Sequence, residues 1–300
     1  MRSVLTLIAA GPDHRLAGIA DAVRDALGVT GEPVWLALAE ACDISVDVEE
    51  PAAIESAVRT VIGGAPIDFM LQPSHGRRRR LLVADLESTI IANEMLDELA
   101  AMLDLGDQIA RITRRAMNGD IDFAAALAAR VALLAGTETR VLAEATTRIR
   151  FSPGARTLVA TLRRDGVATA LVTGGFTVFA EPIAAQLGFD RVVANRLETA
   201  GDRLTGRVIP PIVTGETKRI TLLRLARELG IAPAATLAVG DGANDLPMLN
   251  AAGLGIAYHA KPAVAAAIRT RLNHAGLTGL LYAQGYYKTD FVIPAGTSQL

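Results

Sequence analysis

Polar residues that can bind a phosphate or a metal ion follow three short apolar runs of this 300-residue sequence. The runs cover residues 81–84, 168–172 and 235–239, and the polar residues after them are Asp85, Glu87, Thr173, Gly174, Asp241 and Asn244. Two carboxylates held close together repel each other unless a cation neutralises them. Mg²⁺ meets this need, since it binds one or two carboxylates together with water and phosphate oxygens. The pattern therefore indicates metal-assisted chemistry on a phosphate group.

Lys218 is a cation in a place that does not favour helix stability. Residues 216–229 predict a helix, and Lys218 falls in its first turn, where a positive charge opposes the helix dipole. A surface pair with Glu216 would contribute little. Glycine-rich turns such as 173–175 offer amide hydrogens to anions. We therefore expect Lys218 to meet a bound anion beside such turns.

Buried strands must bring these residues together. Wholly apolar runs such as 81–84 are typical of parallel strands that are buried on both faces. Similar runs recur, with helical segments between them, at 168–172, 192–194, 235–239 and 254–257. This alternation predicts an α/β fold with a doubly wound, Rossmann-like parallel sheet, whose strands carry the chemistry at their carboxyl ends.

A long segment without a strand pattern separates the first two of these strands. Helices are predicted there at 94–103, 108–117, 123–134 and 138–149. An insertion at this point leaves the sheet at the edge where the polar residues gather. We interpret it as a helical cap over the site.

Composition and charge exclude several classes of protein. The net charge is −2 and half of the residues are apolar, so no strong positive field attracts nucleic acid or an acidic membrane. No apolar run reaches the roughly 20 residues of a membrane span. Cys42 is the only cysteine, which excludes an internal disulfide and fits a reducing compartment. We expect a cytoplasmic enzyme with a small-molecule substrate.

Four groups of residues, in order, resemble the motifs of the haloacid dehalogenase superfamily, and more narrowly those of the phosphoserine phosphatases. They are 85–89, 173–176, Lys218 and 240–245, and the resemblance extends from about residue 81 to 287. The narrower resemblance depends on Glu94, on the stretch 116–123 and on Arg130. It implies Mg²⁺-dependent hydrolysis of phosphoserine in the last step of serine biosynthesis.

The resemblance implies a role for each matching residue. Asp85 would be the nucleophile that forms an aspartyl-phosphate, and Glu87 would protonate the leaving serine oxygen. Mg²⁺ would bind Asp85, Asp241 and the backbone carbonyl of Glu87, with Asp245 ordering its surroundings. The phosphoryl group would contact Thr173, the Gly174 amide, Lys218 and Asn244. In the cap, the substrate carboxylate would meet Arg130, its ammonium Glu94, and its apolar side Met117 and Phe123.

Two positions depart from the usual family pattern, and several residues have simpler explanations when taken singly. Glu87 stands where aspartate is common, and Thr173 stands where serine is common. Asp85 alone could cap a helix, Glu94 could favour a helix dipole, and Arg130 could extend to solvent. Action on another small phosphomonoester, or phosphoryl transfer to an alcohol such as homoserine, stays open.

The first 76 residues predict a separate small α+β module that resembles a reduced ACT-like domain. We expect it to bind serine, to form a homodimer, or only to stabilise the chain. The four arginines at 77–80 are interpreted as a solvated connector. The expected division is the module (1–76), the catalytic core (77–92 and 151–290), the cap (93–150) and a tail (291–300).

Overall fold

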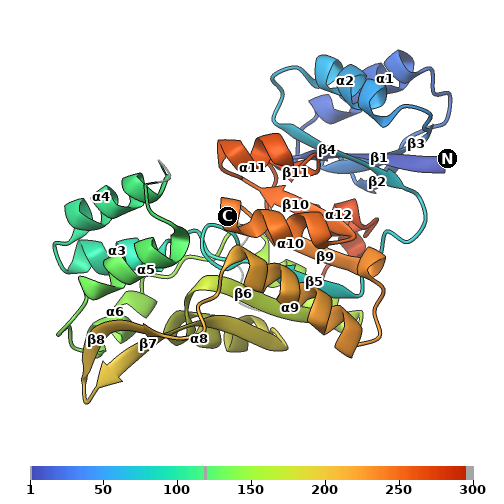
Figure 1. Ribbon diagram of the computed structural model, residues 1–300. Coiled ribbons are helices and arrows are strands. Elements are labelled where there is room, and N and C mark those ends of the chain that lie inside the picture. Colours follow the sequence, from blue (N-terminus) through green and yellow to red (C-terminus); the bar gives the residue numbers. More distant parts are fainter. Residues whose placement is uncertain (1, 118–119, 295–300) are drawn as a thin grey trace.

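The computed structural model describes residues 2–117 and 120–294, in which two β-sheets organise the chain (Figure 1). The smaller sheet belongs to the N-terminal part, and the larger sheet carries a group of helices at one end. No helix within the two described ranges is both long and apolar enough to span a bilayer.

The smaller sheet is antiparallel, with the strand order β2-β3-β1-β4. The elements of this N-terminal module are β1 (Arg2–Ala9), α1 (Arg15–Leu27), β2 (Val34–Ala37), β3 (Ala41–Asp47), α2 (Pro51–Ile62) and β4 (Ile67–Pro73). Both helices cover one face of the sheet (Figure 1), where Leu5, Leu16 and Val58 are fully buried in one apolar cluster. The βαββαβ order is the ferredoxin-like arrangement.

The larger sheet has the strand order β11-β10-β9-β5-β6-β7-β8. Its strands are β5 (Leu81–Ala84), β6 (Ala168–Phe176), β7 (Arg191–Ala200), β8 (Arg203–Ile209), β9 (Thr236–Gly240), β10 (Leu254–Tyr258) and β11 (Arg271–Leu272). Neighbours pair in parallel except β7 and β8. Every residue of β5, β9 and β10 is buried, as parallel strands covered on both faces require.

Helices cover both faces of this sheet, which makes it doubly wound as predicted. Side chains of β5 alternate between two apolar clusters: Leu81 packs in the cluster that contains Leu222, and Leu82 packs in the one that contains Leu158. The helices of the core are α7 (Ala155–Arg164), α8 (Thr177–Leu187), α9 (Gly215–Glu228), α10 (Leu246–Ala251), α11 (Pro262–Ala267) and α12 (Gly279–Ala283).

The cap follows β5 and is held against the β7–β8 hairpin. Its helices are α3 (Met95–Met102), α4 (Gly106–Met117), α5 (Phe123–Ala132) and α6 (Arg140–Thr146). The Gly136 amide donates to the Leu204 carbonyl at 2.8 Å, and the Leu204 amide donates to the Thr137 carbonyl at 2.9 Å. The edge hairpin thus extends the sheet to the cap, below which it lies in Figure 1.

Three strands were not expected from the sequence. In β3 apolar and polar residues alternate (Ala-Cys-Asp-Ile-Ser-Val-Asp), but the segment lacks the long apolar run on which the prediction depended. The strand β8 pairs antiparallel with β7, so the sheet is mixed at this edge and not wholly parallel. The two residues of β11 are too few for a sequence pattern.

The interpretation of residues 77–80 as a solvated connector was wrong for Arg77. Its side chain is only 12% exposed, and Nη1 lies 2.6 Å from Oδ2 of Asp43. The same guanidinium donates to the carbonyl of Ala283 at 3.2 Å. The physical reason is that Asp43, on the unexpected strand β3, needs a cation when it is buried. Arg77 therefore joins the module to the C-terminal part of the core.

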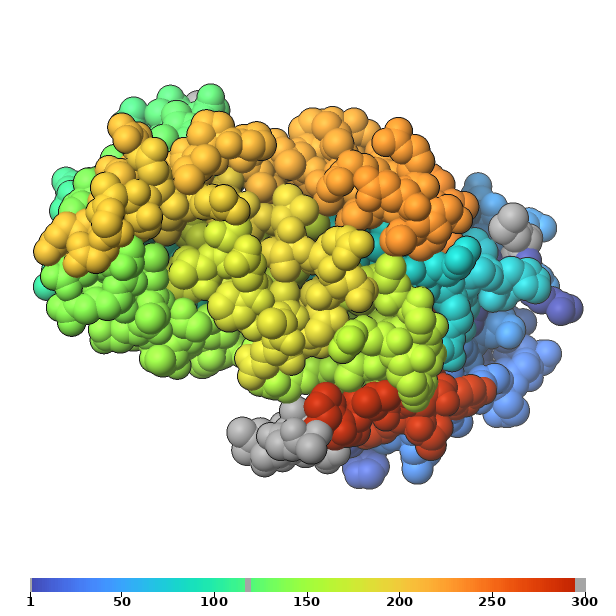
Figure 2. All heavy atoms as spheres, turned by 90° about the horizontal axis from the view of Figure 1, so that it is seen from below, coloured from blue at the N-terminus to red at the C-terminus, as the bar shows by residue number. Residues whose placement is uncertain are grey.

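The C-terminal part of the core lies against the N-terminal module. The Tyr282 hydroxyl donates to Oε2 of Glu40 at 2.9 Å. Figure 2 shows the red C-terminal segment between the core and the blue residues of the module. The exact boundaries given above for module, core, cap and tail stay a prediction.

Candidate active site

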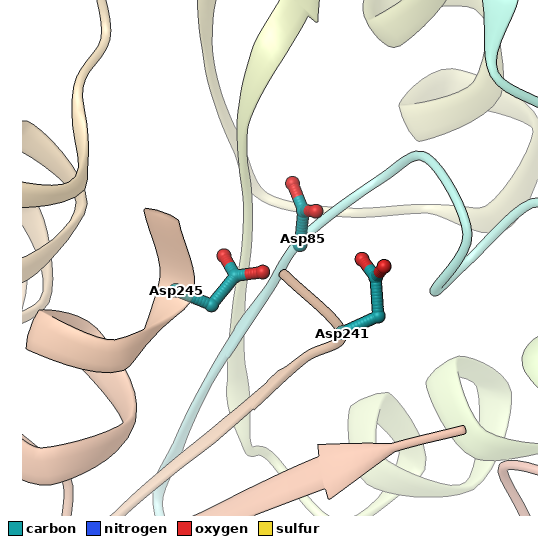
Figure 3. A group of neighbouring side chains, drawn as sticks. All are labelled: Asp85, Asp241 and Asp245. Carbon is teal, nitrogen blue, oxygen red and sulfur yellow. The ribbon is translucent and has the colours of Figure 1, made fainter. Parts of the chain in front are cut away.

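Three aspartates come together where β5 and β9 end (Figure 3). Asp85 follows β5, Asp241 follows β9, and Asp245 lies just before α10. Ligand oxygens of the three carboxylates all lie within 4.8 Å of one another, and all three residues are buried. Because β5 and β9 are parallel neighbours, their carboxyl ends deliver Asp85 and Asp241 to the same edge.

Lys218 neutralises part of this charge. Its ammonium Nζ lies 2.6 Å from Oδ1 of Asp85 and 2.6 Å from Oδ1 of Asp245, and its side chain is fully buried. Burial alone would lower the pKa of Lys218, but the carboxylates of Asp245 and Asp85 raise it above the usual value. Lys218 therefore stays charged at neutral pH. Its helix α9 is fixed at the start by Thr214, whose hydroxyl accepts from the Thr217 amide at 3.3 Å.

The aspartate cluster suits a divalent cation. Burial, followed by the nearby charge of Asp85, raises the pKa of Asp241 above its usual value, so Lys218 does not fully balance the negative charge of the cluster. Such a buried set of carboxylate oxygens is the donor type that hard divalent ions prefer. The residues present therefore fit a metal ion.

Glu87 is a partly buried acid. Its Oε1 accepts from the Met95 amide at 2.8 Å, at the start of α3. Burial, followed by the charge of Glu94, raises the pKa of Glu87 to about 8. A Cβ atom at position 175 would lie 2.7 Å from Oε2, so the approach of Glu87 requires Gly175. A carboxyl group in this environment is protonated at neutral pH and can donate a proton.

The end of β6 supplies hydroxyl and amide groups. The Thr173 hydroxyl accepts from the Gly175 amide at 2.9 Å. The Gly174 carbonyl accepts from Nδ2 of Asn195 at 2.7 Å, and Oδ1 of Asn195 accepts from the Val213 amide at 2.8 Å. Asn195, which the sequence did not single out, thereby fixes the orientation of the Gly174 peptide.

The cap closes a cavity of about 170 Å³ over these strand ends. Phe123 and Arg130 of α5 line it from the cap side, and Phe123 lies so close to Gly174 that a Cβ there would be 3.1 Å from its ring. The cavity is therefore small and mostly polar, with apolar contacts from the cap. The residues of the core and of the α3 side that line it include Asp85, Glu87, Glu94, Thr173, Gly174, Asp241, Asn244 and Lys261.

The structure brings together nearly all the residues that the sequence singled out. Lys218 contacts the cavity through Asp85, and the predicted residues that line it are Asp85, Glu87, Glu94, Phe123, Arg130, Thr173, Gly174, Asp241 and Asn244. The side chain of Met117 lies outside the described part of the chain, as do Asn118 and Gly119 of the same stretch. The chemical role of each residue stays a proposal.

Lys261 was missed. Its Nζ lies 3.3 Å from Oδ2 of Asp241 and 3.9 Å from Oε1 of Glu94. The same Oε1 of Glu94 accepts a 2.8 Å hydrogen bond from the Ser88 hydroxyl. Lys261 shortly follows β10, at the same sheet edge as the other site residues. The run at 254–257 was predicted as a strand, so its position after a strand end was the available signal.

Comparisons with known proteins agree with this geometry. Residues 82–250 match the family of haloacid dehalogenase-like hydrolases. A phosphoserine phosphatase of Streptomyces coelicolor is 41% identical over 83% of this chain and 62% of its own length. One of Vibrio cholerae is 41% identical over 67% of this chain and 61% of its own length. This chain thus spans about three fifths of these two relatives.

A solved structure is similar over almost the whole chain. It is a haloacid dehalogenase family hydrolase of Salmonella enterica serovar Typhi, with a TM-score of 0.86 and 30% identity. The match covers 96% of this chain and 98% of that one, so it includes the N-terminal module. The chain belongs to the haloacid dehalogenase-like hydrolase family, in the branch that contains proteins named phosphoserine phosphatase.

Proposed function

We propose that the chain hydrolyses O-phospho-L-serine to L-serine and phosphate with Mg²⁺, through an aspartyl-phosphate on Asp85. The observation that carries this proposal is the pairing of Asp85 with buried Lys218 at the floor of a small cavity whose wall includes Arg130 and Glu94. The names of the relatives support the same substrate.

Asp85, Asp241 and the backbone carbonyl of Glu87 would hold the Mg²⁺ ion, and Asp245 would order its surroundings. The bound ion would supply positive charge that offsets the repulsion between a carboxylate and a phosphate. Lys218 supplies a second positive charge, with its Nζ 2.6 Å from Oδ1 of Asp85. Asp245 is held in place by Lys218 and by the Gly242 amide, which donates to its Oδ2 at 3.0 Å.

In the first step an oxygen of Asp85 forms a bond to phosphorus as the bond between phosphorus and the serine oxygen breaks. Glu87 donates its proton to the departing serine oxygen, and the raised pKa of Glu87 permits this at neutral pH. In the second step Glu87 takes a proton from water as the water attacks phosphorus. The phosphorus–oxygen bond to Asp85 then breaks, which releases phosphate and restores the carboxylate.

The phosphoryl oxygens would be held by the Thr173 hydroxyl, the Gly174 amide, Lys218 and Asn244. These donors stand in a buried site, where charge that develops in the transition state is stabilised more than in water. Glu87 is longer than the usual aspartate by one methylene. Its Oε1 accepts a hydrogen bond from the Met95 amide at 2.8 Å, which would orient the longer side chain.

Selectivity would come from the cap. Arg130 would bind the substrate carboxylate, since its only hydrogen bond among the described residues is a 3.3 Å contact from Nε to the Ala126 carbonyl of its own helix. Glu94 would face the ammonium group, and Phe123 would pack on the β-carbon, with Met117 proposed beside it. A small α-amino acid phosphate carries all three features.

The test is phosphate release by the purified protein with Mg²⁺ from phosphoserine, phosphothreonine, phosphoethanolamine and glycerol phosphate. We expect phosphoserine to have the highest kcat/KM. A preference for a phosphate that lacks the carboxylate would overturn the substrate assignment. Addition of homoserine distinguishes transfer from hydrolysis, since a transferase would form phosphohomoserine in place of free phosphate.

The position in serine biosynthesis follows only if this substrate is correct. A cytoplasmic location, a homodimer and serine binding by the N-terminal module stay predictions from the sequence.

A further inference from the structure

A second cavity lies between the N-terminal module and the core. Its volume is about 270 Å³, which exceeds that of the active-site cavity. It opens where α2 and β4 of the module meet β11, which neighbours β4 in Figure 1. The polar and aromatic residues that line it are Arg59, Asp68, Phe69, Arg269, Arg271, Asn273 and His274.

The positive charges of this junction cavity outnumber the negative charges available to them. Glu55 serves two arginines, with Oε1 at 2.7 Å from Arg269 and Oε2 at 3.9 Å from Arg59. The carboxylate of Asp68 is already used by the backbone. Its oxygens accept from the amides of residues 273, 274 and 275 at 2.7, 3.0 and 2.8 Å.

Arg271 has no carboxylate partner within 4.0 Å among the residues that the structure describes. Its Nη1 donates to the Ala265 carbonyl at 2.6 Å, and most of its other donors have no acceptor in the described part of the protein. Partial burial, followed by the charge of Arg59, lowers the pKa of Arg271 below its usual value. Two like charges are thus held at one cavity against their repulsion.

Arg59 is oriented by the module. Its guanidinium carbon lies 4.8 Å from the ring centre of Phe69, and the pair approaches the cavity from α2 and β4. Arg271 approaches from β11 of the core. A single anion between the two guanidinium groups would therefore contact both parts of the chain. Guanidinium forks match the geometry of carboxylate and phosphate oxygens.

We propose that the junction cavity binds a small oxyanion, phosphate or carboxylate, between Arg59 and Arg271, and that this anion strengthens the attachment of the N-terminal module to the core. The site is separate from the active site, because none of its lining residues lines the cavity above the aspartates. Its test does not require that phosphoserine be the substrate.

The test is binding of inorganic phosphate to the full chain in EDTA, measured by calorimetry and by thermal unfolding at constant ionic strength. EDTA leaves the aspartate cluster without a metal, so phosphate is repelled there. We expect saturable binding that raises Tm, with a Kd at least tenfold weaker in Arg271→Gln. Arg59→Gln, which changes an exposed side chain of α2, should show the same loss and serves as the second variant if Arg271→Gln unfolds.

Arg224→Gln is the matched control, since Arg224 is an exposed arginine on α9 that pairs with Glu228 at 3.3 Å, away from both cavities. It should bind phosphate as the unchanged protein does. Equal phosphate affinity of Arg59→Gln, Arg271→Gln and the unchanged protein would overturn the proposal. So would a protein that binds none of phosphate, acetate and L-serine in a saturable way. Stabilisation by acetate but not by phosphate, lost in Arg271→Gln, would identify the oxyanion as a carboxylate.

Discussion

The ammonium of Lys218 lies 2.6 Å from Oδ1 of Asp85, although 133 positions separate the two residues in the sequence. The fold brings them together because Asp85 follows a central strand and α9 begins beside the same sheet edge. The same ammonium reaches Asp245 at 2.6 Å. A single buried cation therefore orients the proposed nucleophile and neutralises a second carboxylate.

Replacement of Lys218 by Met tests both of these effects. We expect kcat to fall about 10²–10³-fold, since a donor to the transferred phosphoryl group is lost. Tm of the metal-free protein should also fall, because removal of one partner of a buried ion pair costs on the order of 3–5 kcal/mol. Addition of Asp245→Asn should restore most of the stability but not turnover. Recovery of turnover in the double variant would show that Lys218 only neutralises the carboxylates and does not bind the phosphoryl group.

Glu87 should destabilise the metal-free protein as the pH rises. The unfolded chain releases this proton near the usual carboxyl pKa of 4.5, whereas the folded chain retains it to a pKa of about 8. Between these values the unfolded state binds fewer protons, so the free energy of unfolding falls as pH increases. Glu87→Gln keeps an oxygen for the Met95 amide but does not ionise. The Tm difference between Glu87→Gln and the unchanged protein should grow by a few degrees from pH 5 to pH 8.

The matched control for this series is Glu216→Gln. Glu216 is exposed, and its hydrogen bond with Arg219 lowers its pKa. The Tm of Glu216→Gln relative to the unchanged protein should therefore not rise between pH 5 and pH 8. A Tm difference for Glu87→Gln that stays constant with pH would contradict a raised pKa at residue 87. Thermal unfolding in EDTA at several pH values provides the measurement.

Arg130→Ala should separate substrate recognition from chemistry. Loss of a hydrogen-bonded ion pair with the substrate carboxylate costs about 1.5–3 kcal/mol, which raises KM for phosphoserine roughly 10- to 100-fold. Hydrolysis of phosphoethanolamine, which lacks the carboxylate, should change little. Arg140→Ala, in an exposed cap pair with Glu138, is the control. Equal losses on both substrates would remove Arg130 from carboxylate recognition.

Lys261→Met should strengthen metal binding. The Lys261 ammonium lies 3.3 Å from Oδ2 of Asp241 and competes with any cation for that carboxylate. Because Lys261 is more than half exposed, we expect the half-saturating Mg²⁺ concentration to fall only roughly two- to fivefold. Lys288→Met, which removes a surface pair with Glu40, should leave it unchanged. A higher half-saturating Mg²⁺ concentration in Lys261→Met would show instead that Lys261 supports metal binding.

The sequence predicted the centre of the core well, because parallel strands that are buried on both faces must be apolar throughout. Residues 81–84 and 235–239 carry this pattern, and the polar residues directly after them had to meet at one edge. The strands at the sheet edges carry weaker patterns. The antiparallel strand β8 reads Arg-Leu-Thr-Gly-Arg-Val-Ile and pairs locally with β7, so no long apolar run marks it.

The candidate site shows the same division. Asp85 and Asp241 were found because a strand end is a local feature of the sequence. The end of β10 is a local signal for the position of Lys261, but its contact with Asp241 depends on how β9 and β10 lie next to each other. Asn195 was missed for the same reason, since its partners Gly174 and Val213 lie 21 and 18 positions away.

The most direct test of the account is to trap the phosphoryl group during turnover. The protein is mixed with Mg²⁺ and excess phosphoserine and quenched in acid, the acyl phosphate is reduced with borohydride, and the digested peptides are analysed by mass spectrometry. We predict homoserine at position 85, and neither this product nor phosphate release in Asp85→Asn. Phosphate release by Asp85→Asn at the rate of the unchanged protein, or a phosphoryl group trapped at another residue, would contradict the account.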